Sequence, residues 1–338
     1  MNHSRNTVFM NTAAIYGPDP IHLEGRTGSR YWVHHDYEFT GNTEVDARLS
    51  GYPVAVFQPV GRKASDTPIV ISLQGIAAPY QLNSFIIPTL LDMGICCVLF
   101  DAPLGGERSL TRTFKGDSLI EAQAFRKHGV PLSTRLVLAM MEAVARDFAT
   151  IIRLIQERHG LVNDRIALLG ASWGTLLSSY AFMRFGIGSR LLGTIGHADL
   201  IGFTRSYMPF ITPLLISPLG RMIGKVANVF LGTGPTIVDG ALDFLSVLQA
   251  VSKGDNLTQQ ANPMTYRHMV EKHRRVRFLV GKNDPLVKPA AAIACAKMFP
   301  DGEAYVVPGL GHGNHSFGPD FVEHVRHFIG TQLGDWKS

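Results

Sequence analysis

The stretch RIALLGASWGTLLSSYAF, residues 165–182, joins two apolar runs through the pentapeptide GASWG at 170–174. The first run has the length of a buried strand and the second that of a helix. Two glycines that bracket a serine at such a junction match the pattern G-x-S-x-G, which places the serine on a sharp turn with its hydroxyl exposed. The N-terminus of the following helix favours negative charge at this point. We therefore predict that Ser172 lies at the carboxyl end of a sheet strand, where it can act as a nucleophile.

Strand-like and helix-like segments alternate along the rest of the chain. Short apolar runs include PIVISLQG (68–75), ICCVLFD (95–101) and VRFLVG (276–281), and the longest helical pattern extends from about Ser133 to His159. Buried strands separated by helices are typical of a parallel sheet that is covered on both faces. The sequence therefore predicts an α/β fold with a mostly parallel central sheet of about eight strands.

The domain organisation follows from where this alternation stops. Residues 200–272 are apolar, are interrupted by Pro and Gly, and contain no strand-like run. We expect them to form a helical lid, or cap, inserted over the carboxyl ends of the strands. Residues 31–199 and 273–338 would form the core, and residues 1–30 an N-terminal arm.

Composition excludes several classes of protein. Of the 338 residues, 46% are hydrophobic and 17% charged, and the net charge of +5 is scattered, which disfavours a nucleic-acid partner. The three cysteines show no metal-ligand spacing, so we expect no metal and a reducing, cytoplasmic location. No signal peptide is recognised at the N-terminus, and the most apolar stretch, residues 207–232, contains three prolines and two basic residues. It is a poor candidate for a stable membrane span.

A serine hydroxyl needs a base to become a nucleophile, and the chain supplies candidates in the order Ser, Asp, His. Asp284 follows a predicted strand in VRFLVGKNDPLV, and His312 lies in the glycine-rich loop GLGHG after the last predicted strand. Asp199 and His315 are competing candidates for the acid and the base. Asp284 could also serve only to cap a turn.

These three segments resemble the α/β-hydrolase family, from about Tyr52 to the C-terminus outside the insertion. LQG before Ile76 and DAPLGGERS at 101–109 resemble the family's oxyanion loop and its D-x-x-G-x-G-x-S loop, although Gln74 stands where the family often has histidine.

The resemblance implies a serine hydrolase without a cofactor. Its catalytic residues would be Ser172, Asp284 and His312, and the backbone N–H groups of Ile76 and Trp173 would form the oxyanion hole.

Serine at this turn, where related dehalogenases and epoxide hydrolases carry aspartate, favours hydrolysis of a small-molecule carboxylic ester. The segment GASWGT also resembles prolyl iminopeptidases, but their His-Gly-Gly-Pro-Gly loop is absent and the insertion has few carboxylates. Acyl transfer to an alcohol, hydrolysis of other acyl compounds and a non-catalytic binding role stay open, as does a homodimer.

The composition of the insertion bears on the substrate. Its apolar residues either pack the lid onto the body or line a pocket for an apolar or uncharged ester. The candidates for such a lining are Phe203, Tyr207, Met208 and Phe210.

Overall fold

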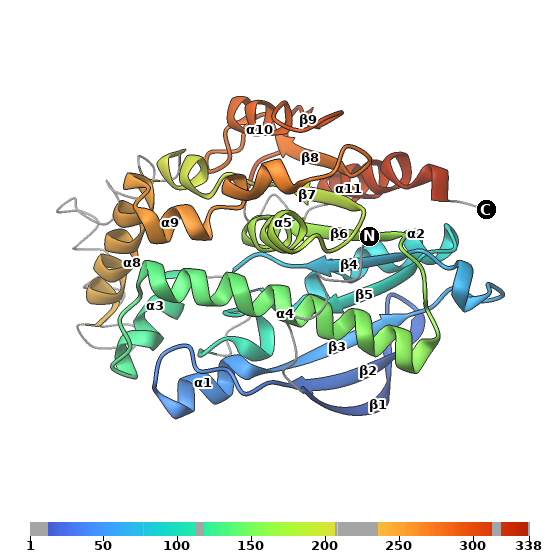
Figure 1. Cartoon of the computed structure of the whole chain (residues 1–338), viewed down its shortest axis with the longest axis horizontal. Coiled ribbons are helices and arrows are strands. Elements are labelled where there is room, and N and C mark those ends of the chain that lie inside the picture. Colours follow the sequence, from blue (N-terminus) through green and yellow to red (C-terminus); the bar gives the residue numbers. More distant parts are fainter. Residues whose placement is uncertain are drawn as a thin grey trace.

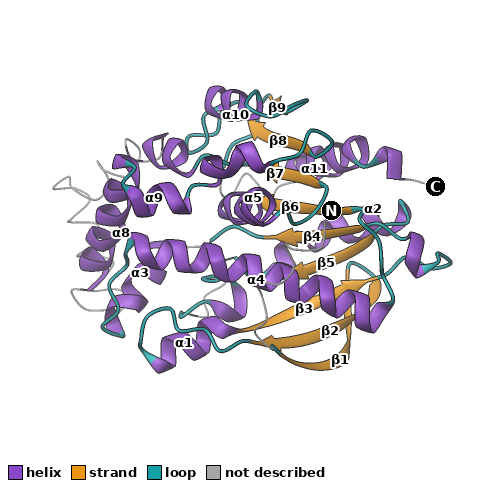
Figure 2. Cartoon of the chain, in the orientation of Figure 1, coloured by secondary structure: helices purple, strands orange, loops and turns teal. Residues whose placement is uncertain are grey.

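The computed structural model describes residues 13–76, 78–111, 118–206, 208, 236–312 and 319–336. Its strands form one nine-stranded sheet in the order β1-β2-β3-β5-β4-β6-β7-β8-β9 (Figures 1 and 2). The strands are β1 (Ala14–Leu23), β2 (Arg26–His34), β3 (Gly51–Phe57), β4 (Ile69–Leu73), β5 (Cys96–Phe100), β6 (Ile166–Ala171), β7 (Arg190–Thr194), β8 (Arg275–Gly281) and β9 (Glu303–Val307). The helices are α1 (Thr43–Ser50), α2 (Ile87–Asp92), α3 (Ser118–Lys127), α4 (Thr134–His159), α5 (Trp173–Phe185), α8 (Thr236–Lys253), α9 (Asn256–Ala261), α10 (Pro289–Ala296) and α11 (Pro319–Gln332). Short 3₁₀ helices of three to seven residues lie between or after these elements.

The sheet is parallel from β5 to β9 and antiparallel from β1 to β3. The strand β3 pairs antiparallel with β5 and joins the two parts. In the parallel part Leu73 of β4 is level with Phe100 of β5 and with Gly170 of β6. The carboxyl ends of these central strands therefore lie side by side, and the loops that follow them emerge at one edge. The predicted α/β class with a mostly parallel sheet is confirmed.

The N-terminal region differs from the predicted arm at residues 1–30. Residues 14–30 belong to the hairpin β1–β2, which adds an outer strand to the predicted set of about eight. The strand β1 is largely exposed, and it contains Pro18 and Pro20. Edge strands tolerate proline because one side of their backbone needs no ladder hydrogen bond. An exposed strand lacks a hydrophobic pattern, which is why the sequence did not indicate it.

Helices cover both faces of the sheet because the central strands are apolar on both sides. Ile71 of β4 belongs to the cluster that α4 and α5 complete, whereas Val70 belongs to the cluster of α2 and α11. The helix α4 begins after Ser133, whose side chain caps the N–H of Leu136, and ends at Gly160 with a φ of 66°. These are the limits that the sequence predicts for the long helix.

The described part of the insertion at 200–272 is helical and contains no strand. Its helix α8 packs against α3, and Arg126 and Asp243 form an ion pair of 2.8 Å between them. The helices α3, α8 and α9 lie together beyond the arrowheads of the parallel strands (Figures 1 and 2). The helix α3 lies in the segment between β5 and α4.

Candidate active site

The turn between β6 and α5 holds Ser172 in a conformation with φ of 51° and ψ of −116°, which is strained for a residue other than glycine. The two flanking glycines are required by close packing. A methyl group on Gly170 would meet the carbonyl of Gly174, and one on Gly174 would lie 2.7 Å from the carbonyl oxygen of Leu73. The backbones of β4, β6 and α5 thus meet at this turn with no room for a side chain.

Two hydrogen bonds hold the turn against the sheet. The N–H of Ser172 donates to the carbonyl of Thr194 at 2.9 Å. The hydroxyl of Thr175 donates to the carbonyl of Gly170 at 2.9 Å. These bonds tie the turn to β7 and to its own strand, so the strained backbone is held by its surroundings.

The hydroxyl of Ser172 points to a histidine and not to its own helix. Its Oγ lies 3.1 Å from Nε2 of His312, and it makes no capping bond to α5. On the other side of the ring, Nδ1 of His312 lies 2.8 Å from Oδ2 of Asp284. The carboxyl of Asp284 is fully buried, whereas the imidazole is 11% exposed. The three side chains from three different loops form one hydrogen-bonded chain.

The loops that carry Asp284 and His312 are tied together by their backbones. Asn283 donates its N–H to the carbonyl of Leu310 at 3.1 Å, and that carbonyl also lies against Gly281, where a side chain would clash. Glycine at position 281 lets the β8 loop approach the β9 loop closely. The separation between acid and base is therefore set by backbone packing.

The competing acid lies elsewhere. The carboxylate of Asp199 accepts a hydrogen bond from Nδ2 of Asn262 at 3.2 Å, and Oδ1 of Asn262 accepts the N–H of Leu200 at 3.0 Å. Asp199 thus links the start of the insertion to Asn262 within it. Of the two candidate acids, only Asp284 has a described bond to His312. The competing base His315 lies outside the described residues.

Of the two expected oxyanion donors, Trp173 directly follows Ser172, and Ile76 follows Gly75, which lies close to the serine. Trp173 is the first residue of α5, so its N–H has no carbonyl one turn earlier within the helix. Gly75 lies opposite, because a Cβ placed there would be 3.5 Å from Cβ of Ser172. Ile76 follows Gly75 and packs its side chain on a cluster that includes Leu104 and Phe125. The backbone at Gly75, one residue before Ile76, is thus beside the serine.

Phe203 and Met208, two of the predicted substrate-lining residues, pack in two different hydrophobic clusters. Phe203 is half-buried and packs on the cluster around Val280 and Val287. Met208 packs on Leu245 and Leu248, two residues of α8. Tyr207 and Phe210 lie outside the described residues. Phe203 therefore packs the insertion onto the body, whereas Met208 packs within the insertion itself.

A buried histidine near the site escaped the sequence analysis. His197 follows β7, is fully buried, and accepts the N–H of Asp199 at Nδ1 over 3.2 Å. Burial lowers the pKa of His197 to about 4, although the negative charges of Asp199 and Asp284 act to raise it. The ring is therefore neutral at physiological pH. Its only signal in the sequence was its place directly after an apolar strand.

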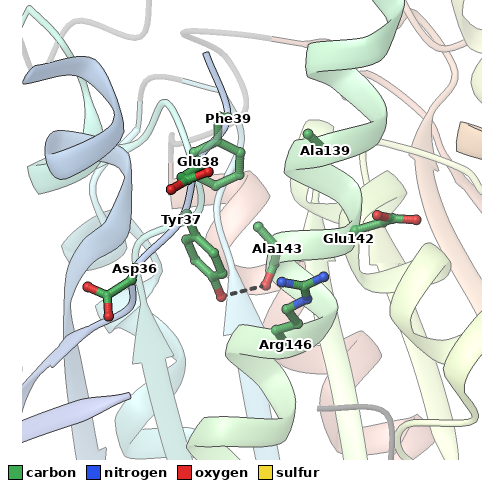
Figure 3. A pocket seen from close by; sticks show the side chains of 8 residues that line it. All are labelled: Asp36, Tyr37, Glu38, Phe39, Ala139, Glu142, Ala143 and Arg146. Carbon is green, nitrogen blue, oxygen red and sulfur yellow. Dashed lines mark hydrogen bonds between the residues drawn. The ribbon is translucent and has the colours of Figure 1, made fainter. Parts of the chain in front are cut away.

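A cavity of about 310 Å³ lies away from Ser172, between the segment 36–39 and α4. Figure 3 shows its acidic side chains spread around it, with Asp36 and Glu142 on opposite sides. These carboxylates do not converge on a common point. In the described part of the chain, no group of three or more His, Cys, Asp or Glu is arranged to hold a metal ion, and no helix is long and apolar enough to cross a bilayer.

The chain was compared with known proteins by sequence. No family model matches it. Esterase YjfP of Escherichia coli K12 is 26% identical over 171 residues, which are 50% of this chain and 62% of that protein. The chain thus matches less than two thirds of the length of this curated relative.

Comparison with solved structures gives the fold. Acetyl xylan esterase 1 from Thermoanaerobacterium sp. superposes with a TM-score of 0.54 at 12% identity, over 94% of this chain and 87% of that one. The esterase Pf2001 of Pyrococcus furiosus gives a TM-score of 0.50 at 13% identity, over 97% and 92% of the two chains. Together with the sheet order and the turn at Ser172, these likenesses show that the chain has the α/β-hydrolase fold.

Proposed function

We propose that the protein is a serine hydrolase that cleaves carboxylic esters of apolar or uncharged small molecules. The observation that carries the proposal is the hydrogen-bonded chain from Ser172 through His312 to Asp284. Its order of nucleophile, base and orienting acid is the one that acyl transfer requires. The likeness to a protein named as an esterase supports the same reaction class.

The proposed reaction proceeds in two halves. Nε2 of His312 takes the proton from Oγ of Ser172 as that oxygen attacks the ester carbonyl carbon. The histidine then gives this proton to the departing alkoxide oxygen, so that an alcohol leaves and an acyl group stays on Ser172. In the second half His312 takes a proton from water, the hydroxide attacks the acyl carbon, and the proton returns to Oγ as the acid departs.

Two features would stabilise the charges that develop. The negative oxygen of each tetrahedral intermediate would accept the N–H groups of Trp173 and Ile76, each contributing about 3–4 kcal/mol of transition-state stabilisation. The buried carboxylate of Asp284 would stabilise the imidazolium, because the pair is almost free of solvent screening. The same carboxylate fixes the tautomer in which Nε2 accepts a proton.

The insertion at 200–272 serves in this proposal as a lid over the site, and its apolar residues favour an uncharged substrate. An aminopeptidase would need free carboxylates there to hold the ammonium group of its substrate. Three of the carboxylates in the insertion already have partners: Asp243 pairs with Arg126, Asp255 caps α9 through Thr258, and Glu271 lies 3.4 Å from His273. These pairings favour the esterase over the peptidase.

The cysteines agree with the expected cytoplasmic location. Cys96, Cys97 and Cys295 are all buried and free. Burial raises the pKa of the Cys97 thiol well above its ordinary value, which keeps it protonated and unreactive.

A substrate panel tests the proposal. Nitrophenyl esters of graded acyl length are assayed beside the nitroanilides of proline and leucine, with the wild type and Ser172→Ala. We expect ester turnover by the wild type, none above background by Ser172→Ala, and little turnover of the anilides. Turnover of the anilides alone would show that the reaction is peptide hydrolysis.

A further inference from the structure

Asp101 lies at the end of β5, beside the loop that bears the proposed oxyanion donor Ile76. Its side chain is 1% exposed, and both carboxyl oxygens accept backbone N–H groups. Oδ1 accepts from Tyr80 at 2.7 Å and Oδ2 from Glu107 at 2.9 Å. One carboxyl group thus links two loops, 74–80 after β4 and 101–109 after β5.

The loop at 74–80 leads from this link to the nucleophile. Gly75 borders Ser172, and Ala78 donates its N–H to the carbonyl of Gly75 at 3.4 Å. The two loops also touch directly, because a methyl group on Gly105 would lie 2.7 Å from the carbonyl oxygen of Ala78. A shift at Tyr80 would therefore be transmitted through a short, tightly packed segment to the backbone beside the serine.

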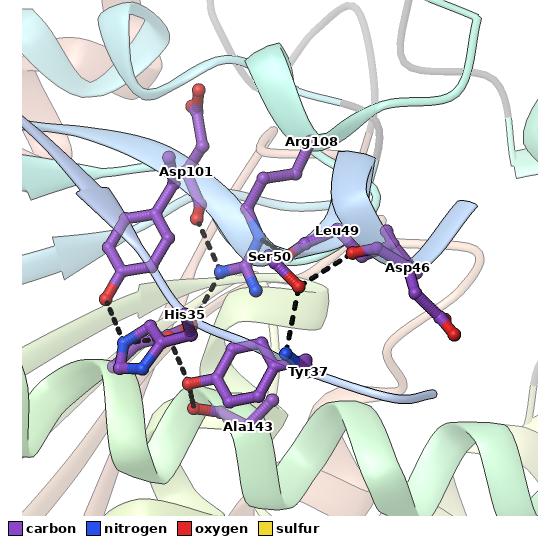
Figure 4. A network of polar contacts seen from close by, with 10 residues as sticks. His35, Tyr37, Asp46, Leu49, Ser50, Asp101, Arg108 and Ala143 are labelled. Carbon is purple, nitrogen blue, oxygen red and sulfur yellow. Dashed lines mark hydrogen bonds and ion pairs between the residues drawn. The ribbon is translucent and has the colours of Figure 1, made fainter. Parts of the chain in front are cut away.

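Among the described residues, the carboxyl of Asp101 has no direct cationic partner. The guanidinium of Arg108 donates to the main-chain carbonyl of Asp101 at 3.3 Å (Figure 4). The same guanidinium pairs at 2.6 Å with the carboxylate of Asp147. Burial is the main cause that raises the pKa of Asp101 to about 7, and the charge of Glu107 adds to it. The N–H groups of Glu107 and Tyr80 and the charge of Arg108 act in the opposite direction.

We propose that Asp101 is a positioning residue for the oxyanion loop, which it holds against Ser172 through the N–H of Tyr80. The proposal rests on the function proposed above. As a carboxylate, Asp101 accepts at both oxygens and anchors both loops. When protonated, one of its oxygens becomes a hydroxyl, which accepts an N–H more weakly than a carboxylate oxygen does, so the anchor of one loop is weakened.

The expected consequence is a second ionisation in the pH profile. His312 must be neutral to act as a base, and Asp101 must be ionised to hold the loop. Since burial places the pKa of Asp101 near neutrality, both requirements fail as the pH falls. The acid limb of log kcat against pH should therefore have a slope that approaches two, instead of the slope of one that a single base gives.

The variant Asp101→Asn tests this, with Asp46→Asn as a matched control. Asp46 is also buried, and its carboxyl accepts the N–H groups of Thr40 and Gly41, away from the loop at 74–80. In Asp101→Asn we expect kcat for a nitrophenyl ester at pH 8 to fall at least tenfold, KM to change less than threefold, and the acid limb to have a slope of one. Asp46→Asn should keep the wild-type kcat and the slope near two.

Gly105→Ala provides a second variant if Asp101→Asn does not fold. Its methyl group presses on Ala78 and displaces the same loop without removing the carboxyl, so kcat should fall while the slope stays near two. A folded Asp101→Asn with the wild-type kcat and pH profile would overturn the proposal. If Asp101→Asn does not fold, a wild-type kcat in Gly105→Ala would overturn it. A wild-type protein without ester turnover would instead overturn the proposed function.

Discussion

Oδ2 of Asp284 faces Nδ1 of His312 at 2.8 Å, while Oδ1 of the same carboxylate accepts the N–H groups of Leu286 and Val287 at 2.8 and 2.9 Å. The two oxygens therefore have separate tasks. Oδ1 holds the loop after β8, and Oδ2 is left to orient the imidazole. This division explains how the acid can be both rigidly placed and available to the base.

The division makes Asp284→Asn an informative substitution. Asparagine keeps an oxygen for Leu286 and Val287, but it presents an NH₂ group to His312 and so favours the tautomer with a proton on Nε2. We expect kcat for an ester to fall by about 10⁴-fold with little change in the unfolding midpoint. Asp199→Asn is the control, because Asp199 is bonded to Asn262, and it should keep turnover within a few-fold. A large loss only in Asp199→Asn would assign the acid to Asp199.

The turn at Ser172 predicts a cost for any side chain at position 174. A methyl group there would meet the carbonyls of Leu73 and Gln74. We expect Gly174→Ala to lower the free energy of unfolding by about 1–3 kcal/mol and to reduce ester turnover, since the displaced backbone borders the site. Gly330→Ala in α11 meets open space and should leave both quantities unchanged or slightly raise stability. Urea unfolding measures the change in stability, and ester kinetics measure the change in turnover. If Gly174→Ala and Gly330→Ala had the same stability and the same turnover, the close packing at Gly174 would be contradicted.

The buried pair of Arg108 and Asp147 holds the loop at 101–109 against α4. Both side chains are fully buried, and the hydroxyl of Tyr37 also donates to Asp147 at 2.7 Å. Removing one partner leaves an uncompensated charge, so we expect Arg108→Met to destabilise the protein by about 3–5 kcal/mol. The double variant Arg108→Met, Asp147→Leu should be more stable than Arg108→Met alone in urea unfolding. Additive losses would mean that the two charges do not compensate each other.

The raised pKa of Asp101 predicts how the free energy of unfolding changes with pH. The folded protein holds this proton up to about pH 7, whereas the unfolded chain releases it near 3.8. Between these values the folded state binds more protons, so the stability from this group is full below pH 3.8 and is lost as the pH rises through 7. At 1.36 kcal/mol per pKa unit the loss is at most about 4 kcal/mol. The free energy of unfolding of the wild type minus that of Asp101→Asn should decline as the pH rises from about 3.8 to 7. A difference that does not change with pH would contradict the raised pKa.

The parts of the site that could be predicted from sequence are those determined by local signals. The turn at Ser172 combines a strand, two glycines and a helix within 18 residues, and the loops of Asp284 and His312 carry their own Gly and Pro residues. Each element is specified by its neighbours in the chain. The structure brings the three side chains together at the edge where the strands end.

The parts that could not be predicted depend on contacts between distant segments. Arg108 and Asp147 are 39 positions apart, and nothing in either segment indicates that a charge is buried there. The link from Asp101 to Tyr80 requires knowing that β5 and β4 are neighbours in the sheet. The helix α3 packs against α8, which lies more than 100 residues later in the chain. Because this tertiary contact stabilises α3, the local sequence of α3 gives little sign of a helix.

The most direct test of the central claim is labelling with a fluorophosphonate, which reacts with an activated serine. The account predicts one adduct per wild-type chain, located at Ser172 by peptide mass spectrometry, and no adduct on Ser172→Ala. An unlabelled wild type, or an adduct on another residue that persists in Ser172→Ala, would contradict the assignment of Ser172 as the nucleophile.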